Sequence, residues 1–431
     1  MPVCATSLAT HDRTRQSRKK PICRIGNGKQ GALALSGLAP KRYSFPMNYF
    51  PDDPALIRCT RCVMDSRVPG IHFDAQGVCQ YCHMQDRMEK DFPLGEAGQK
   101  ILESFTQKAR AAGKGKPFDC VVGVSGGRDS SYCLYYVKEV MGLRPLAVHF
   151  DNGWDSEVAK TNISRLCDAL DVELHTVIMD WPESRELTNA NIRACVPYID
   201  IFDDIGIANS LYRTAEKEGI KYVFLAHSFR EEGVTPLVWN YVDGRFQQAI
   251  IDRFCKMPLK QYKNIDIPQM LYWMFVKGIR VVNITNYYDD VGEHVETLMK
   301  EKLNWLDTGQ HHMDNEMFAL VYYYARHKFG FDWRIVELSA KVRTGVLSRE
   351  EALKALTEVP FFENEELVNY GLKKQGLSRE EFDTILQAPN KYFTDYPSWY
   401  PLIRTMRWPL FVLCRLHILP AHAYEKWIKA I

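Results

Sequence analysis

The feature that most constrains the fold is a glycine-rich turn placed between a predicted strand and a predicted helix. Residues 118–124 form a short apolar run typical of a buried strand, and residues 132–141 carry apolar side chains at helical spacing. The segment between them reads Ser125-Gly126-Gly127-Arg128-Asp129-Ser130-Ser131. A strand, a glycine turn and a helix in this order direct backbone N–H groups and the helix N-terminus at an anion. We therefore predict a phosphate-binding loop, with an ordinary strand-to-helix turn as the alternative.

The side chains of this loop predict different roles in anion binding. Gly126 and Gly127 allow a tight turn and the close approach of a phosphate. Hydroxyl donors are added by Ser125, Ser130 and Ser131. Asp129 is a poor phosphate contact because of its charge, so it is better suited to bind Mg2+ or to cap the helix. The pattern is neither G-x4-G-K-[ST] nor G-x-G-x-x-G, so it is neither a Walker loop nor a dinucleotide-binding loop.

Apolar runs and helical segments alternate after the loop. Further strands are predicted at residues 145–150, 172–179 and 221–226, and helices at 156–170 and 203–218. This alternation predicts an α/β fold with a doubly wound parallel sheet and helices on both faces. Ligands bind such sheets at the carboxyl ends of the strands. The polar segments at those ends are Ser125–Ser131, Asp151–Trp154, Asp180–Trp181 and His227–Gly233.

Four cysteines before this region occur as two C-x2-C pairs separated by sixteen residues. They are Cys59, Cys62, Cys79 and Cys82. A two-residue gap lets two thiolates converge on one ion, and two such pairs complete a closed tetrahedral site. We therefore predict a zinc-ribbon module with a structural Zn2+; four buried or redox-active cysteines are the alternative. One charged helix is expected to follow, from Met84 to about Lys116.

Charge divides the chain into unequal parts. Residues 1–46 contain nine Lys and Arg against one acidic residue, a net charge of +8. Because the whole chain carries +2, residues 47–431 carry −6. We predict a basic, disordered tail there, with a nucleic-acid arm as the alternative. Residues 47–116 are predicted to form the cysteine module and a linker, 117–300 the α/β domain, and 301–431 a mainly helical region.

The composition is ordinary for a soluble globular chain, with 46% hydrophobic and 25% charged residues. The nearest candidate for a membrane span, residues 408–419, is short and interrupted by charged and proline residues. No apolar export segment is present, and twelve cysteines in 431 residues do not suggest a disulfide scaffold. We therefore predict no membrane span and a cytoplasmic location. The near balance of charge gives no reason to expect a nucleic-acid partner.

The motifs together resemble a known family. The segment Val124–Ser130 resembles the PP-loop of the ATP pyrophosphatases, which adenylate an oxygen and let a nucleophile displace AMP. With the cysteine pairs, Phe150–Asp155 and Lys328–Asp332, the chain resembles the N-acetyl sugar amidotransferases of surface-polysaccharide and LPS O-antigen biosynthesis. The resemblance covers roughly residues 55–395.

The resemblance implies an amidine-forming reaction on a nucleotide-linked acetamido sugar. ATP and Mg2+ would activate the acetamido oxygen as an O-adenylyl imidate, and ammonia would displace AMP. The residues implied to hold the pyrophosphate are Ser125, Gly126, Gly127, Ser130 and Ser131. Asp129 is implied to hold the metal, and the nucleotide would be flanked by Asp151, Asn152 and Gly153.

Two adjacent histidines in the C-terminal half are candidate catalytic residues. His311 and His312, with nearby Asp314, would supply an acid/base pair or a substrate contact. The alternative is the polar first turn of a helix.

The chain has no recognisable source of ammonia. It begins Met1-Pro2-Val3-Cys4 and contains no G-x-C-x-G, so it shows neither kind of glutaminase nucleophile. The resemblance implies two partner proteins, a glutaminase and a barrel-type protein that supplies the ammonia.

Two other functions fit parts of the pattern. A tRNA thiolation enzyme also joins a PP-loop to cysteine pairs, and Cys195 would be its candidate catalytic cysteine. The net charge of −6 on residues 47–431 argues against a large RNA-binding surface. The second alternative is a zinc-dependent scaffold that does not turn over ATP.

Overall fold

The computed structural model of the chain describes residues 56–288, 293–307, 314–358 and 360–415. They belong to one compact unit that spans residues 48–431. The predicted basic tail, residues 1–46, lies outside the described residues. The described helices are all too short or too polar to cross a membrane.

A five-stranded parallel sheet forms the centre of this unit. Its strands are β1 (Cys120–Gly123), β2 (Pro145–Asp151), β3 (Leu174–Ile178), β4 (Tyr222–Leu225) and β5 (Arg280–Asn283). Their order across the sheet is β3-β2-β1-β4-β5, and every neighbouring pair is parallel. The chain therefore winds outward in both directions from β1, and the direction changes between β1 and β4. In such sheets, ligands bind at the carboxyl ends of the strands beside this change.

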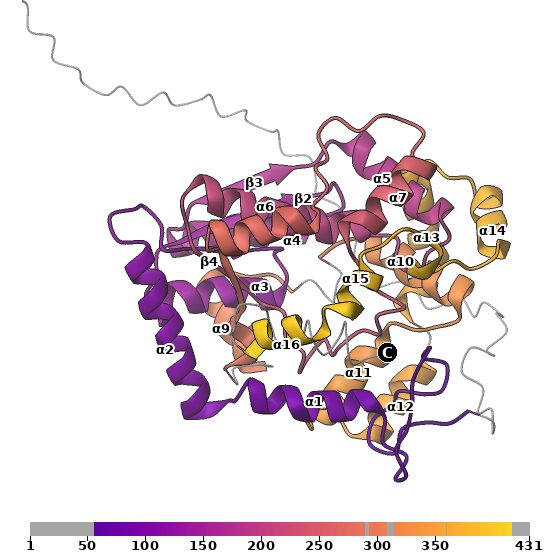
Figure 1. Cartoon of the computed structure of the whole chain (residues 1–431), viewed down its shortest axis with the longest axis horizontal. Coiled ribbons are helices and arrows are strands. Elements are labelled where there is room, and N and C mark those ends of the chain that lie inside the picture. Colours follow the sequence, from indigo (N-terminus) through magenta and orange to yellow (C-terminus); the bar gives the residue numbers. More distant parts are fainter. Residues whose placement is uncertain (1–55, 289–292, 308–313, 359, 416–431) are drawn as a thin grey trace, which may run out of the picture. The chain divides into compact units, whose positions relative to one another are not determined.

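Each face of the sheet packs into a separate apolar core. Val121 and Val223 face one core, to which α6 (Ile201–Lys217) contributes Phe202 and Leu211. Their chain neighbours Val122 and Phe224 face the other core, which contains α3 (Arg128–Tyr135), α4 (Glu157–Leu170) and the cysteine module. Side chains alternate between the two faces of a strand, so buried residues in succession require cover on both sides. The predicted doubly wound α/β fold is confirmed (Figure 1).

The segment after the cysteines forms two helices rather than the single helix predicted from Met84 to about Lys116. They are α1 (Gln80–Asp91) and α2 (Gly95–Ala112). Pro93 separates them, because proline lacks the N–H that the helix ladder needs and disfavours helical geometry in the residue before it. The prediction of one helix is therefore wrong, although the second helix, α2, does end at Ala112, near the predicted linker.

The C-terminal region is mainly helical, as predicted (Figure 1, orange and yellow). Its helices are α9 (Glu293–Leu303), α10 (Met317–Tyr324), α11 (Arg334–Arg343), α12 (Arg349–Thr357), α13 (Glu365–Gln375), α14 (Arg379–Gln387), α15 (Tyr400–Thr405) and α16 (Arg407–Arg415). Between the sheet strands lie α5 (Trp181–Arg193), α7 (Gly244–Phe254) and α8 (Ile267–Leu271). Short π-helical turns follow α3, α8 and α10, at Tyr136–Val140, Tyr272–Val276 and Ala325–Phe329. Single 3-10 turns occur at Ile284–Asn286, Phe361–Glu363 and Phe393–Asp395.

Candidate active site and metal centre

The predicted phosphate-binding loop joins β1 to α3, as expected. Gly126 has a φ of +81°, which non-glycine residues rarely adopt. A Cβ at this position would lie 2.3 Å from the carbonyl oxygen of Ala159 in α4, so Gly126 lets the loop pack against that helix. A Cβ on Gly127 would instead lie 2.8 Å from Oδ2 of Asp314. The two glycines therefore serve different contacts, one with the scaffold and one with the C-terminal region.

Serine hydroxyls close the loop on itself. The backbone N–H of Ser125 donates to Oγ of Ser130 at 3.0 Å, and the two hydroxyl oxygens are also 3.0 Å apart. Ser131 points elsewhere: it is fully buried, and its hydroxyl has no hydrogen-bond partner among the described residues. Adjacent serines at the start of α3 thus have different surroundings.

The loop opens into a cavity of about 600 Å³ at the carboxyl ends of β1, β2 and β4. Of the nine residues implied to hold the nucleotide and its metal, five line the cavity: Ser125, Gly127, Asp129, Ser130 and Asn152. The lining does not include Gly126, Ser131, Asp151 or Gly153. The structure therefore brings together about half of the predicted nucleotide-binding set at one cavity wall.

Asp129 lies in the first turn of α3 and is paired with its neighbour. Nε of Arg128 donates to Oδ1 of Asp129 at 2.7 Å, and the same guanidinium contacts Glu231 at 2.9 Å and Glu296 at 3.7 Å. Arg128 thus holds three carboxylates at one side of the loop. An acidic side chain in the first turn also interacts favourably with the helix dipole.

The segment after β2 forms a tight polar turn. Oδ1 of Asp151 accepts the N–H of Gly153 at 2.8 Å, and Oδ1 of Asn152 accepts the N–H of Trp154 at 2.9 Å. Nδ2 of Asn152 donates to Oδ1 of Asp203 at 2.8 Å. A Cβ on Gly153 would lie 2.7 Å from the ring of Trp181, so glycine permits that close approach. Asp151 and Gly153 shape the turn, whereas Asn152 lines the cavity.

A buried histidine and aspartate pair was missed by the sequence analysis. Nδ1 of His149 lies 3.0 Å from the carbonyl oxygen of Val124, and Nε2 lies 3.1 Å from Oδ2 of Asp155. Burial favours the neutral ring, but the hydrogen bond and charge of Asp155 outweigh it, so the pKa of His149 is raised. The only sequence signal was a histidine at the end of a predicted strand, directly before the polar turn.

A group of three carboxylates at the start of α6 was also missed. Asp203 and Asp204 line the cavity, and Asp200 is 1% exposed at the N-cap position. Burial, with the negative charge of Asp204, raises the pKa of Asp200 to about 8. Burial and the neighbouring carboxylates also raise the pKa of Asp203.

The cavity as a whole is strongly acidic. Among the described residues, ten carboxylates line it against one arginine and one lysine, Arg128 and Lys341. The charge of Glu232, and then its hydrogen bond, raise the pKa of His227, whose side chain is 71% exposed. The acidic residues are Asp129, Asp155, Asp203, Asp204, Glu231, Glu232, Glu296, Asp307, Asp314 and Glu337.

The predicted catalytic residues His311 and His312 lie outside the described residues. The residues on either side of that gap, Asp307 and Asp314, both line the cavity. The chain after the gap pairs with the turn after β2: Ser156 N–H donates to the carbonyl of Asp314 at 2.8 Å. The role of the two histidines stays a prediction.

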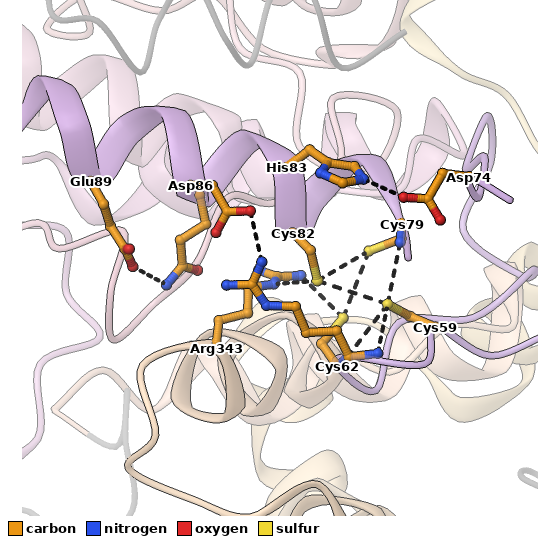
Figure 2. Close-up of polar contacts among 11 residues, drawn as sticks. Cys59, Cys62, Asp74, Cys79, Cys82, His83, Asp86, Glu89 and Arg343 are labelled. Carbon is orange, nitrogen blue, oxygen red and sulfur yellow. Dashed lines mark hydrogen bonds and ion pairs between the residues drawn. The ribbon is translucent and has the colours of Figure 1, made fainter. Parts of the chain in front are cut away.

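The four predicted metal-binding cysteines converge as expected (Figure 2). Their sulfur atoms all lie within 4.8 Å of one another, and all four residues are buried. Cys59 and Cys82 are 3.8 Å apart, and Cys79 lies 3.7 Å from both Cys62 and Cys82. Backbone N–H groups of residues 61, 62 and 79 point at the sulfur of Cys59, at 3.3–3.4 Å. The cluster is therefore able to bind one metal ion.

Two arginines from the C-terminal region contact this cluster. Arg343, the last residue of α11, directs Nε at the sulfur of Cys82 at 3.4 Å and a terminal nitrogen at that of Cys62 at 3.5 Å (Figure 2). Arg349, the first residue of α12, donates to the backbone carbonyls of Cys59 and Cys62 at 3.0–3.2 Å. Hydrogen bonds among the thiols, first with Cys59, and the charge of Arg343 lower the pKa of Cys62.

The cysteine considered for thiolation chemistry lies elsewhere. Cys195 is 8% exposed and is not among the residues that line the cavity. No cysteine occurs in that lining within the described part of the chain. Among the described residues, therefore, no thiol faces the cavity.

One known protein family matches the C-terminal segment that contributes to the cavity. Residues 285–408 match the family model described as LPS biosynthesis protein WbpG-like, C-terminal domain. This match confirms the predicted resemblance to a family of surface-polysaccharide biosynthesis. The WbpG-like segment, residues 285–408, supplies several residues to the cavity, among them Asp314, Glu337 and Lys341. One wall of the cavity therefore comes from the phosphate-loop region and another from the WbpG-like segment.

Individual proteins are similar to this chain at low sequence identity. The uncharacterized protein MJ1599 of Methanocaldococcus jannaschii is 23% identical over 326 residues, covering 74% of this chain and all of that protein. Among solved structures, the NH3-dependent NAD synthetase of Campylobacter jejuni is 15% identical with a TM-score of 0.29, covering 68% of this chain and 98% of the other. The U34-tRNA thiolase NcsA of Methanococcus maripaludis is 11% identical with a TM-score of 0.30, covering 70% and 89%.

Proposed function

We propose that this chain is an ATP-dependent, AMP-forming amidotransferase of surface-polysaccharide biosynthesis. Its substrate is a nucleotide-linked sugar, and it converts an N-acetyl group of that sugar to an acetamidine. The observation that carries the proposal is the shared cavity. The S-G-G-x-D-S loop forms one side of it, and the WbpG-like segment forms another.

The loop is suited to bind a nucleoside triphosphate. The N-terminus of α3 presents backbone N–H groups with a partial positive charge, and the hydroxyls of Ser125 and Ser130 lie beside it. An acidic cavity repels free triphosphate, so the ligand would enter with Mg2+, which lowers that repulsion and polarises the phosphate. We assign Asp129, in the first turn of α3, and Asp314, beside Gly127, to hold the ion.

The reaction divides one difficult displacement into two easier ones. The acetamido oxygen attacks the α-phosphorus of ATP, and pyrophosphate leaves, giving an O-adenylyl imidate. Ammonia then adds to the imidate carbon, the bond from carbon to the adenylate oxygen breaks, and AMP leaves. The nitrogen loses a proton as the amidine forms. His311 and His312 are the acid/base groups that we assign to this proton, as the resemblance implies.

The histidine and aspartate pair fits a positioning role in this reaction. Both ring nitrogens of His149 face acceptors, the carbonyl of Val124 and the carboxylate of Asp155. The raised pKa favours the doubly protonated ring, which donates to both. His149 thereby ties the residue that precedes the loop to the turn after β2.

The acidic lining also fits the nitrogen source. Ammonium is a cation, and a cavity with many more carboxylates than basic side chains attracts it electrostatically. We propose that ammonia comes from a separate glutaminase acting with a barrel-type partner protein in the cytoplasm. A docked source would deliver ammonia at high effective concentration.

The cysteine cluster fits a structural Zn2+. A tetrahedral ion with zinc–sulfur bonds of about 2.3 Å requires sulfur atoms roughly 3.8 Å apart. Three pairs in the cluster lie at 3.7–3.8 Å. Zn2+ held by four protein sulfurs has no open position for a substrate and would stabilise the fold.

The proposal is tested by product analysis. Purified protein is incubated with ATP, Mg2+, ammonium and a panel of nucleotide-linked diacetamido sugars. The product should lose about 1 Da as oxygen is replaced by NH, with one AMP released per amidine. Glutamine should replace ammonium only when the glutaminase partner is added. Sulfur incorporation would instead favour thiolation, and ADP without sugar modification would contradict the proposal.

Two adjacent serines provide a matched pair of variants. Ser130 lines the cavity and bonds to Ser125, whereas Ser131 is buried beneath the loop. Ser130→Ala should lower AMP formation strongly, and Ser131→Ala should have much the smaller effect. Equal losses would contradict the placement of the nucleotide at this wall.

A further inference from the structure

We propose that Arg343 is a positioning residue that couples the metal centre to the cavity through α11. The proposal rests on the proposed binding of ATP in the cavity. It concerns a helix that contacts both places: Val336, Glu337 and Lys341 line the cavity, and Arg343 contacts the cysteine sulfurs.

The two sets of contacts lie within two turns of one helix. α11 spans Arg334–Arg343, and Arg343 lies six positions after Glu337, which corresponds to about 9 Å along a helix. Lys341 is only two residues from Arg343, so the backbone transmits any displacement of one to the other. Lys341 also forms an ion pair with Glu337 on the cavity side.

The charge of Arg343 complements the metal centre. Four thiolates around one divalent ion leave a net charge of about −2, and the centre is buried. The guanidinium of Arg343 supplies a positive charge and directs two nitrogens at two different sulfurs. Charged donors to metal ligands fix those ligands in place and strengthen metal binding. Binding of the ion and placement of α11 therefore favour each other.

The opposite end of α11 is fixed independently. Asp332 accepts the N–H of Arg334 at 2.9 Å and forms an ion pair with its guanidinium at 2.8 Å. The metal centre therefore controls mainly the C-terminal turns of the helix, which include Lys341. Lys341 and Arg128 are the only lysine or arginine side chains among the described residues that line the acidic cavity. The position of Lys341 should therefore affect how well an anionic ligand binds.

Coupling of this kind is reciprocal. If the metal favours the placement of α11 that binds ATP, then bound ATP must raise the affinity for the metal by the same coupling free energy, and we expect this gain to show as slower metal release. This gives a measurement that does not depend on catalysis.

The experiment uses the full-length, Zn2+-loaded protein and a chromogenic Zn2+ chelator. In buffer containing Mg2+, the rate of Zn2+ release is measured with and without saturating ATP, while equilibrium dialysis measures ATP binding in the same samples. In the wild-type protein, ATP should slow release by about fivefold or more. Arg343→Gln should release metal faster, and ATP should no longer slow the release. A Gly127→Val protein controls for chelation of Zn2+ by ATP itself.

The matched control is Arg349→Gln. Arg349 binds backbone carbonyls of the same cysteines but no sulfur and no cavity residue that the structure records. Its loss should speed metal release yet leave the effect of ATP in place. Arg343→Lys keeps the positive charge but loses the guanidinium that reaches two sulfurs. In this variant ATP should still slow metal release, though less than in the wild-type protein. If Arg343→Gln does not fold, the ATP affinity of metal-stripped wild-type protein is measured instead. It should be about fivefold weaker than that of the Zn2+-loaded protein.

The outcomes separate this proposal from the proposed function. Failure of ATP to bind in dialysis would contradict the proposed function. ATP that binds without slowing metal release, or an effect that persists in Arg343→Gln, would overturn the coupling alone.

Discussion

Asp200 is a carboxylate whose burial should make the protein less stable as the pH rises. Its side chain is 1% exposed, and neither oxygen has a hydrogen-bond partner among the described residues. Burial first, and then the charge of Asp204, raise the pKa of Asp200 to about 8. The folded chain therefore keeps a proton on this group at neutral pH, whereas the unfolded chain, with a pKa of about 3.9, has released it.

The sign and size of the effect follow from this difference. Between about pH 5.5 and pH 7.5 the folded state binds one proton more than the unfolded state, so stability falls as the pH rises. Each pH unit costs about 1.4 kcal/mol while the folded group stays protonated, and approach to its pKa reduces the loss at the upper end. The free energy of unfolding should fall by roughly 2 to 3 kcal/mol over this range because of Asp200 alone.

The perturbation is Asp200→Asn, which keeps the size and polarity of the side chain and removes its titration. Urea unfolding of the Zn2+-loaded wild-type and variant proteins is measured at both pH values. The variant should gain roughly 2 to 3 kcal/mol relative to the wild-type protein on going from the lower to the higher pH. Asp168→Asn, on the exposed side of α4, controls for the loss of one negative charge. Parallel pH dependence in the wild-type and Asp200→Asn proteins would refute the reasoning, as would an equal gain in the control.

Three further predictions follow from the loop and the metal centre. Asp129→Ala should abolish AMP formation while circular dichroism and thermal unfolding stay near wild-type; persisting turnover would contradict its assignment to the metal. Gly126→Ala should destabilise the protein by roughly 3 kcal/mol in urea unfolding, from a positive φ and a Cβ 2.3 Å from the carbonyl oxygen of Ala159. Cys79→Ser should lower Zn2+ content by elemental analysis and the melting temperature together, because structural zinc contributes folding free energy. Unchanged melting of the zinc-free protein would contradict that last prediction.

The sequence predicted the sheet well because its strands are strongly apolar runs between polar turns. All four predicted strands are present, with ends that differ by no more than two residues from those expected. β5 was missed because Arg280–Asn283 has only two apolar residues, too few to show a period. The break at Pro93 was missed for another reason: charged residues continue the same pattern on both sides of it, which hides the helix-breaking effect of a single proline.

The site was predictable where its geometry is local. The cysteine pairs and the loop each depend on spacing within a few residues. The structure gathers the four cysteines into one cluster and, separately, places the loop at the cavity. Orientation within a tight turn was not predictable, because consecutive residues point to different sides. Ser130 lines the cavity while Ser131 is buried, and Asn152 lines it while Asp151 bonds to its own turn. Contacts across long stretches of chain were also beyond reach, as with Arg343 and Cys82, which are 261 positions apart.

The Lys328–Asp332 motif shows how a segment outside the cavity can still serve it. Neither Lys328 nor Asp332 lines the cavity. Nζ of Lys328 donates to the carbonyls of Ile385 and Ala388 at 2.7 Å, which satisfies acceptors at the end of α14. Asp332 is 2% exposed and binds Arg334 at the start of α11. The motif thus fixes the N-terminal end of the helix that carries Lys341 into the cavity.

α11 is held at both ends, by Asp332 at its start and by the cysteine cluster at its last residue, Arg343. Its cavity-facing residues lie between these two contacts. Removing the metal should free one of these points and leave the other. A loosened C-terminal turn should therefore weaken ligand binding without unfolding the helix. The Asp332 end offers the complementary perturbation: Asp332→Asn should weaken ATP binding while leaving the rate of Zn2+ release nearly unchanged, because Asp332 makes no recorded contact with the cysteines. Loss of metal in that variant, measured by the same chelator assay, would show that the two ends of α11 do not act separately.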